Sequence, residues 1–382
     1  KMRPHLFSSI RRNSCLLHFR EFNLQILTFA VLAFSVSLLG AQEEIPFLEW
    51  SYPRGEQEMF TTAKTTTDHA GNSVLIGQTI GANGDYDILI VKQDRNGQEL
   101  WNLQVSGTGN GDDFGAAACV DANNVVYATG AVDNGSLNGL DTWVCAISPD
   151  GTILWETEYD TGSSFSEVGT SIDIDSQGGV YVGGSTSTTN SSFDLMGLKL
   201  NQLDGSVTWA SSWDFVGLID GATATRCTGS KVIFTGGAQA SATSWRGVSV
   251  AYAVNDGQLL GEYVTNGGDV SVDVINDVQV SPSGDILVAG RVQELGGQMQ
   301  QVIIKLSPYM EELWSIQSGP EIGNGDFEAN GIEVTELGEV MVCGTHSTQD
   351  SSNVVISKYT STGLLTWQIQ ALLGNYNSQN AV

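Results

Sequence analysis

The carboxylates whose spacing suits cation binding lie in two short loops, NGDDF at residues 110–114 and NGDFE at residues 324–328. Carboxylate oxygens are the ligands that Ca²⁺ prefers in proteins. Each loop precedes a segment expected to form the innermost strand of a repeating unit, so both loops should gather at one face of the molecule. The preferred interpretation is that no metal is bound, and Asp112, Asp113 and Asp326 are the candidates for binding calcium or another cationic ligand at that face. Calcium is the only cofactor that the sequence suggests.

A second stretch, DIDSQG at residues 173–178, is similar to the start of a calcium-binding loop. A glycine stands at its twelfth position, where such a loop needs a bidentate glutamate. Asp175 also shares its place in the repeat with Asp68 and Asp121. Asp is common in tight turns because its side chain accepts hydrogen bonds from nearby backbone. The pattern therefore predicts a turn-forming role for Asp175.

Histidines and nucleophile motifs give little indication of catalysis. His69 and His346 are the histidines outside the N-terminal leader, and they fall in different repeats. Their places in unrelated segments predict solvated turn residues rather than an acid–base or metal site. The sequence contains no G-x-S-x-G, H-E-x-x-H or P-loop motif. No catalytic or cofactor-binding residue is predicted.

The loops must be positioned by a repeating unit, whose mark is a closing tryptophan. This residue recurs at steps of about 51–54 residues, and Gly261 takes its place in one repeat. A glycine stands four residues before that position in every complete unit except one, where Met310 replaces it. The structural anchors of the repeat are Trp50, Trp101, Trp155, Trp209, Trp314 and Trp367.

Each unit contains four apolar segments bounded by Asn, Asp, Gly and Pro, which are strand and hairpin signals. Four antiparallel strands in a repeat of about fifty residues are typical of a β-propeller blade. Such a sheet buries both faces only by stacking on the next blade, and the large flat indole is expected to fill that seam. The sequence therefore predicts an all-β propeller. The seam beside Gly261 should be looser than the others unless Tyr263 compensates.

The pattern predicts a propeller domain over residues 45–382 with six complete blades. Their expected ranges are 59–106, 115–161, 168–214, 221–265, 274–318 and 330–370. Residues 45–52 are consistent with a lone outer strand, and residues 371–382 with the start of another blade. Joining the two segments would give a partial seventh blade and, in a longer reading frame, a closed seven-bladed ring without free sheet edges. A six-bladed ring with frayed ends is the alternative.

The first 41 residues have the composition of a secretory signal peptide. Basic residues precede the apolar run from Ile26 to Gly40, and the small residue Ala41 follows. An uncleaved membrane anchor is the alternative, although the run is short for a full span. We therefore expect a protein that is secreted or held at the cell surface, with no membrane insertion after cleavage.

Net charge, cysteine spacing and oligomeric state complete the expectations for the chain. The formal net charge of −27 disfavours binding to nucleic acid, whose phosphates carry the same sign. The four cysteines of the mature chain show no paired spacing and are interpreted as small packing residues; they are Cys119, Cys145, Cys227 and Cys343. We expect a monomer.

The repeat resembles the secreted bacterial β-propeller repeats known as SBBP, and more loosely the Trp-docked repeats of quinoprotein dehydrogenases. The resemblance spans residues 45–382. The matching residues in one unit are Asp87, Lys92, Gly97, Trp101, Gly111, Asp112, Asp113, Asp121, Tyr127 and Gly130, and in another Asp194, Lys199, Gly205 and Trp209. It implies a seven-bladed extracellular propeller whose activity is mostly undefined. No vicinal cysteine pair occurs, so the quinone chemistry of the looser relatives is not expected here.

Two function classes follow from these observations. The favoured class is an exported, non-catalytic binding or scaffold module that recognises a protein, a glycan or matrix. The alternative is a propeller hydrolase or lyase that uses carboxylates in the central funnel. Convergence of Asp or Glu side chains from different blades on a funnel pocket would favour the enzyme.

Overall fold

The computed structural model describes residues 61–109, 111–135, 139–162, 166–189, 192–268, 271–293, 297–318, 325–348 and 351–375. The described chain forms 24 β-strands in six four-stranded antiparallel sheets. In every sheet the strands pair in chain order, so that each sheet is a simple meander. The all-β propeller architecture predicted from the repeat is confirmed. The described residues contain no helix long and apolar enough to cross a membrane.

The six blades contain the following strands. Blade 1 consists of β1 (Thr61–Thr67), β2 (Ser73–Ile80), β3 (Tyr86–Gln93) and β4 (Glu99–Val105), and blade 2 of β5 (Phe114–Val120), β6 (Val126–Asp133), β7 (Leu140–Ile147) and β8 (Ile153–Tyr159). Blade 3 consists of β9 (Glu167–Ile174), β10 (Gly179–Thr189), β11 (Ser192–Asn201) and β12 (Val207–Trp213), and blade 4 of β13 (Asp220–Cys227), β14 (Lys231–Ser241), β15 (Ser244–Ala253) and β16 (Leu259–Val264). Blade 5 consists of β17 (Val274–Val280), β18 (Ile286–Val292), β19 (Gln300–Leu306) and β20 (Glu312–Ser318), and blade 6 of β21 (Asp326–Val334), β22 (Val340–Ser347), β23 (Ser351–Tyr359) and β24 (Leu365–Asn375).

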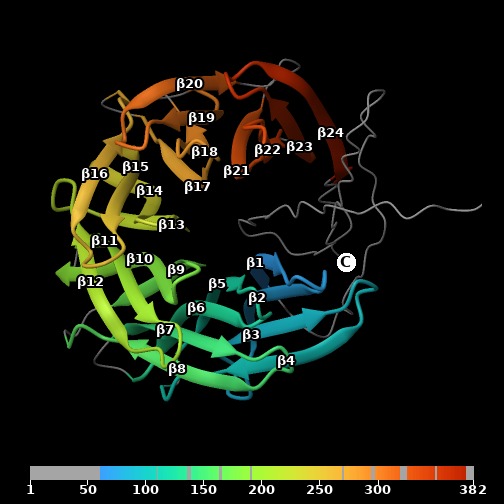
Figure 1. Cartoon of the computed structure of the whole chain (residues 1–382), viewed down its shortest axis with the longest axis vertical. Helices are drawn as coiled ribbons and strands as arrows, with labels where there is room; N and C mark the ends of the chain where they lie inside the picture. Colours follow the sequence, from blue (N-terminus) through green and yellow to red (C-terminus); the bar gives the residue numbers. More distant parts are fainter. Residues whose placement is uncertain are drawn as a thin grey trace, which may run out of the picture.

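The blades follow one another around a central axis (Figure 1). The first strand of each blade faces this axis and the fourth lies at the outer rim. The innermost strands line a cavity, and we call the space that they surround the central channel. Blades 1 and 6 do not lie next to each other as the other neighbouring blades do. Trp50 and residues 45–52, which would begin the expected seventh blade, lie outside the described residues. The seven-bladed ring stays a prediction.

Blade 6 differs from its expected range at both ends. Its innermost strand begins at Asp326 rather than near residue 330, and its outer strand continues to Asn375 rather than ending at residue 370. The pairing of Ser351 with Asn375 accounts for the longer outer strand. Residues 371–375 therefore belong to blade 6 and do not start another blade.

The hydrophobic core is divided among the seams between blades. Ile90 of blade 1, for example, lies in one buried cluster with Val126 and Trp143 of blade 2. Corresponding clusters join each later pair of neighbouring blades. Each sheet therefore depends on its neighbours for burial of its faces, as the repeat pattern requires.

The closing tryptophans of blades 1 to 3 contact the last hairpin turn of the following blade. Trp101 donates a hydrogen bond from Nε1 to the carbonyl oxygen of Pro149 at 3.0 Å. Its ring also packs on Gly151, where a Cβ atom would lie only 2.8 Å from Cγ of the indole. Gly151 has φ of 92°, a conformation that residues with a side chain rarely adopt. Glycine is therefore required at this position both by the turn and by the tryptophan.

At the seam between blades 4 and 5 the large and the small residue change places. Gly261 replaces the tryptophan, and Met310 replaces the turn glycine with φ of 67°. The Met310 side chain is 5% exposed, and a Cβ on Gly261 would lie 3.2 Å from its Cγ. Tyr263 packs in the same cluster and donates a hydrogen bond to Glu312 at 2.6 Å. The expected looser seam is thus filled by the methionine of the next blade together with Tyr263.

Lysines form a further column of the repeat. The lysines that face the tryptophans are engaged with acidic neighbours or a blade edge: Lys92 with Asp68, Lys305 with Asp285, Lys358 with Glu339, and Lys199 with the carbonyl oxygen of Val254. The cysteines lie where packing residues are expected: Cys145 and Cys343 are buried, and Cys119 and Cys227 are half-buried.

Candidate functional site: the central channel

Each innermost strand contains a β-bulge at an equivalent position. The register to the second strand shifts by one residue at 63, 116, 170, 223, 276 and 330. A bulge leaves one residue outside the regular pairing and bends the strand. Because the bulges recur in all six blades, they place equivalent residues around the channel.

Side chains at three of these bulges join one blade to the next. Thr170 donates a hydrogen bond to the carbonyl oxygen of Ala222 at 2.6 Å, and Thr223 donates to that of Ile275 at 2.6 Å. Asn276 repeats the contact by donating to the carbonyl oxygen of Ala329 at 2.9 Å. In each case the acceptor is the residue just before the next bulge. Blades 3 to 6 are therefore fastened to each other at the channel wall.

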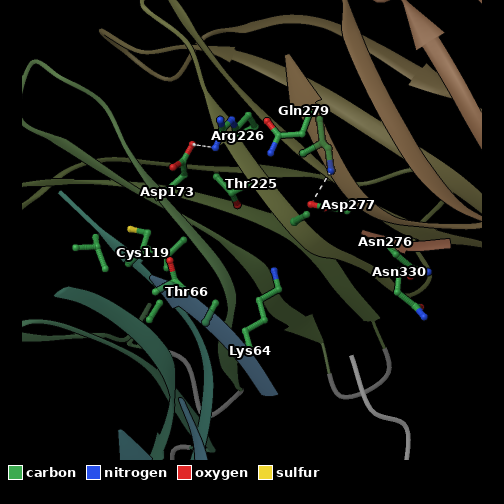
Figure 2. A pocket seen from close by; sticks show the side chains of 16 residues that line it. Lys64, Thr66, Cys119, Asp173, Thr225, Arg226, Asn276, Asp277, Gln279 and Asn330 are labelled. Carbon is green, nitrogen blue, oxygen red and sulfur yellow. Dashed lines mark hydrogen bonds and ion pairs between the residues drawn. The ribbon is translucent and has the colours of Figure 1, made fainter. Parts of the chain in front are cut away.

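A cavity of about 220 Å³ lies within the channel, and its lining comes from the innermost strands of all six blades. Figure 2 shows that Asp173 and Arg226 face each other across neighbouring blades, while Asp277 lies further along the wall. Lys64 extends from blade 1, and its Nζ lies 3.5 Å from the carbonyl oxygen of Thr223 in blade 4. The cavity thus brings charged groups of both signs together from separate repeats.

Among the described residues, two carboxylates line the cavity, and both accept hydrogen bonds from the next blade. Asp173 accepts one from the backbone N–H of Cys227 at 2.8 Å and lies 3.9 Å from the guanidinium of Arg226. Asp277 accepts one from the backbone N–H of Ile332 at 2.9 Å. Carboxylates from different blades do converge on a funnel pocket, as the enzyme alternative requires. Both, however, form hydrogen bonds that join neighbouring blades.

Glu333 lies beside this group and accepts a hydrogen bond from Gln279 at 3.1 Å. Burial, together with the negative charge of Asp277, raises its pKa to about 7, and Arg226 opposes this only in part. The folded protein therefore binds a proton here that the unfolded chain releases at a lower pH. Stability from this group is present below the unfolded pKa and is lost as the pH rises through about 7.

We expect the substitution Glu333→Gln to raise the free energy of unfolding by about 1–3 kcal/mol at pH 8. At pH 4 it should have little effect, because the carboxyl group is then protonated in both states. Urea unfolding across this pH range measures the difference. Glu336→Gln, at an exposed turn position, is the control and should change little. An equal effect of Glu333→Gln at both pH values would contradict the prediction.

The candidate calcium ligands lie in two different seams, each held by backbone donors. Asp112 accepts the N–H of Tyr86 at 3.0 Å, and Asp326 accepts that of Met299 at 2.9 Å. Asp113 accepts the N–H of Gly107 at 2.8 Å and that of Asp133 at 2.7 Å. Asp112 and Asp113 therefore lie between blades 1 and 2, whereas Asp326 lies between blades 5 and 6. The three residues do not form one site.

The structure confirms the predicted turn positions of Asp175 and His69 but not that of His346. Asp175 accepts the N–H groups of Gln177 and Gly179 at 2.7 and 2.9 Å, which confirms its turn-forming role. His69 lies exposed in a turn as predicted. The prediction for His346 was wrong: it lies in β22, is 7% exposed and packs edge-on against Phe327. Its Nδ1 also lies 3.2 Å from Nε2 of Gln370 in β24.

A column of buried acidic residues at the start of the innermost strands was not predicted from the sequence. Its members are 0–3% exposed: Asp113, Glu167, Asp220 and Asp273. Each of these residues stands eight positions before the first residue of the turn between the first two strands. Aligning the repeats on that turn residue would have revealed the column. Only Asp113 was selected from it, because the neighbouring residues are not acidic in the other three repeats.

Comparisons with known proteins concern the fold alone. No protein-family model and no curated protein matches the chain. A protein of unknown function from Bacteroides caccae superposes with a TM-score of 0.46 at 12% identity, covering 76% of this chain and 90% of that one. The quinohemoprotein alcohol dehydrogenase of Comamonas testosteroni has a TM-score of 0.49 at 10% identity, over 81% of this chain and 65% of that one. A europium-containing methanol dehydrogenase has a TM-score of 0.49 at 13% identity, over 91% of this chain and 76% of that one.

Proposed function

We propose that the protein is an exported β-propeller that serves as a non-catalytic binding or scaffold module for a protein, glycan or matrix partner. The leader at residues 1–41 and the resemblance of the repeat to secreted bacterial propeller repeats support export and a place outside the cell. A rigid ring with loops at both faces suits recognition, because such loops carry binding residues on a fixed scaffold.

The use of the channel carboxylates carries the proposal. Asp173 and Asp277 are the acidic residues that line the cavity, and each accepts a backbone hydrogen bond from the next blade. A general acid or base must exchange protons with a substrate and needs a side chain free to reach it. Carboxylates committed to joining blades make the channel wall rigid. This use in joining blades supports the scaffold proposal, whereas the convergence of Asp173 and Asp277 on one cavity is the feature on which the hydrolase or lyase alternative depends.

Fractionation of cells that express the full sequence tests export. We expect the mature chain outside the cytosol, with Gln42 at its N-terminus by mass spectrometry. Cytosolic protein that retains residues 1–41 would contradict export.

Binding and turnover are tested on the purified mature chain with immobilised polysaccharides and purified matrix proteins as probes. We expect saturable binding of at least one probe without release of cleaved product. Product release that is abolished by Asp173→Asn or Asp277→Asn, in variants with native circular dichroism, would establish the enzyme alternative. Absence of binding to every probe would refute the module as proposed.

A further inference from the structure

Three carboxylates meet at the seam between blades 2 and 3. Asp141 lies in β7, Asp160 directly follows β8, and Glu167 begins β9 of the next blade. Each offers one oxygen, and these three oxygens lie within 4.8 Å of one another. Asp141 is 5% exposed and Glu167 is 0% exposed, whereas Asp160 is exposed to solvent. The group is therefore a buried acidic pair with a third carboxylate at its entrance.

Each buried carboxylate uses only one of its two oxygens for hydrogen bonds within the described residues. Asp141 accepts a bond from Asn134 through Oδ2 at 3.0 Å, and Glu167 accepts one from Thr161 through Oε1 at 2.8 Å. The other oxygens, Oδ1 of Asp141 and Oε2 of Glu167, are buried without a hydrogen-bond partner. Leaving a buried acceptor unsatisfied is costly, and more so when the group is charged.

Positive charge is also lacking at this group in the part of the chain that the structure describes. None of the three carboxylates forms an ion pair with a described lysine or arginine. Burial raises the pKa of Asp141 and of Glu167, and the negative charge of Asp160 raises both further. Buried charges in proteins are normally paired or coordinate a metal.

Two other seams place protein donors at the equivalent carboxylates. Between blades 1 and 2, Asp87 accepts a hydrogen bond from Gln104 at 2.5 Å, and Ser106 stands at the position of Asp160. Between blades 4 and 5, Asp273 accepts a bond from Thr265 at 2.7 Å and is stabilised by the nearby Arg246. Between blades 3 and 4 the equivalent residues are Asp194, Asp214 and Asp220, where Oδ1 of Asp220 is also unsatisfied and Phe215 donates its N–H to Oδ2 at 2.8 Å. Among the described residues, however, only Asp141, Asp160 and Glu167 bring three carboxylate oxygens within 4.8 Å of one another, and two of these residues have an unsatisfied oxygen.

We propose that Asp141, Asp160 and Glu167 bind a Ca²⁺ ion that joins blades 2 and 3. Calcium takes oxygen ligands at about 2.3–2.6 Å, so one ion can contact three oxygens that lie this close together. It also tolerates irregular geometry, with water completing its coordination shell through the exposed side at Asp160. Because Asp141 and Glu167 belong to adjacent sheets, the ion ties the two blades together.

Calorimetric titration of the full chain with CaCl₂ tests the proposal, after removal of bound metal with EDTA. We expect one site with a dissociation constant of about 10 µM to 1 mM. Saturating Ca²⁺ should raise the melting midpoint by about 2–4 °C, since a ligand that binds only the folded state stabilises it. Asp160→Asn, which changes only an exposed side chain, should weaken binding at least tenfold.

Glu167→Gln distinguishes an ion site from a purely structural cluster by the sign of its effect. In EDTA this variant should melt at or above the wild-type temperature, because it relieves repulsion, whereas in CaCl₂ it should melt below. Asp87→Asn, in the seam between blades 1 and 2, is the matched control and should keep the full calcium response. Lack of heat and of a melting shift up to 10 mM CaCl₂ would overturn the proposal. An unchanged response in Asp160→Asn and Glu167→Gln, or a response to MgCl₂ alone, would also overturn it.

Discussion

Replacing Lys92 with methionine is expected to lower the free energy of unfolding by about 3–5 kcal/mol, because it leaves a buried carboxylate without its cation. Lys92 and Asp68 form an ion pair at 2.9 Å in blade 1, and each side chain is 2% exposed. The ammonium also lies 6.0 Å from the centre of the Trp101 ring. Burial alone would raise the pKa of Asp68, but hydrogen bonds from Lys92 and Asn72 outweigh it and lower the pKa. Equilibrium unfolding in guanidinium chloride at pH 7 measures the loss.

The double variant Lys92→Met with Asp68→Asn tests the cause of this loss. Asn retains an oxygen that can accept the N–H groups of Ala70 and Asn72, as Oδ1 of Asp68 does. It removes the unpaired charge, so the double variant should be more stable than Lys92→Met alone. Lys358→Met is the control from the same column. Its partner Glu339 is 34% exposed at 3.4 Å, and we expect a loss of about 1 kcal/mol or less. Equal losses in the two single variants would contradict the explanation.

The fold could be predicted because its determinants recur at a fixed period. The closing tryptophan, the glycine before it and the turn aspartate each do the same local task in successive blades. Trp101 on Gly151 and Trp155 on Gly205 illustrate this, since a Cβ on either glycine would collide with the indole. A repeated steric requirement leaves a repeated residue, and such a column is visible in the sequence alone.

The channel could not be predicted in the same way, because its positions recur while their residue types change. The bulges hold Thr170 and Thr223 in two blades but Asn276 and Asn330 in the next two. The same register shift recurs in each, and threonine and asparagine can both donate to a neighbouring carbonyl group. Alignment by residue identity therefore does not reveal this column.

The acidic cluster could not be predicted from the sequence, because it is recognised by hydrogen bonds that are missing in the packed structure. Asp141, Asp160 and Glu167 come from two blades, and each is unremarkable in a chain with 43 acidic residues. Their significance lies in two oxygens that the protein leaves unsatisfied, which only the packed structure can show. The calcium candidates chosen from sequence lie in two different seams, and backbone N–H groups of other segments donate to each of them.

The exchange at the seam between blades 4 and 5 gives the second large prediction. Gly261→Trp alone should destabilise the protein by about 1–3 kcal/mol, because Met310 already fills the space that an indole needs. Met310→Gly alone should also destabilise it, through the loss of a side chain that is 5% exposed in the core. Relief of the left-handed backbone at φ of 67° offsets part of this second loss.

The two substitutions together recreate the pair found in the other seams, with Trp on Gly. We therefore expect the double variant to be more stable than the sum of the single effects predicts, by about 1–3 kcal/mol. Denaturant unfolding of the four proteins in the cycle measures this coupling. The reverse exchange at the preceding seam, Trp209→Gly with Gly257→Met, is the matched control, and its coupling should also be favourable because Gly257 touches the Trp209 ring. Additive effects in both cycles would show that the residue at the tryptophan position and the turn residue of the next blade do not compete for the same volume. Favourable coupling in both would show that seam volume, rather than tryptophan itself, is what each blade requires from its neighbour.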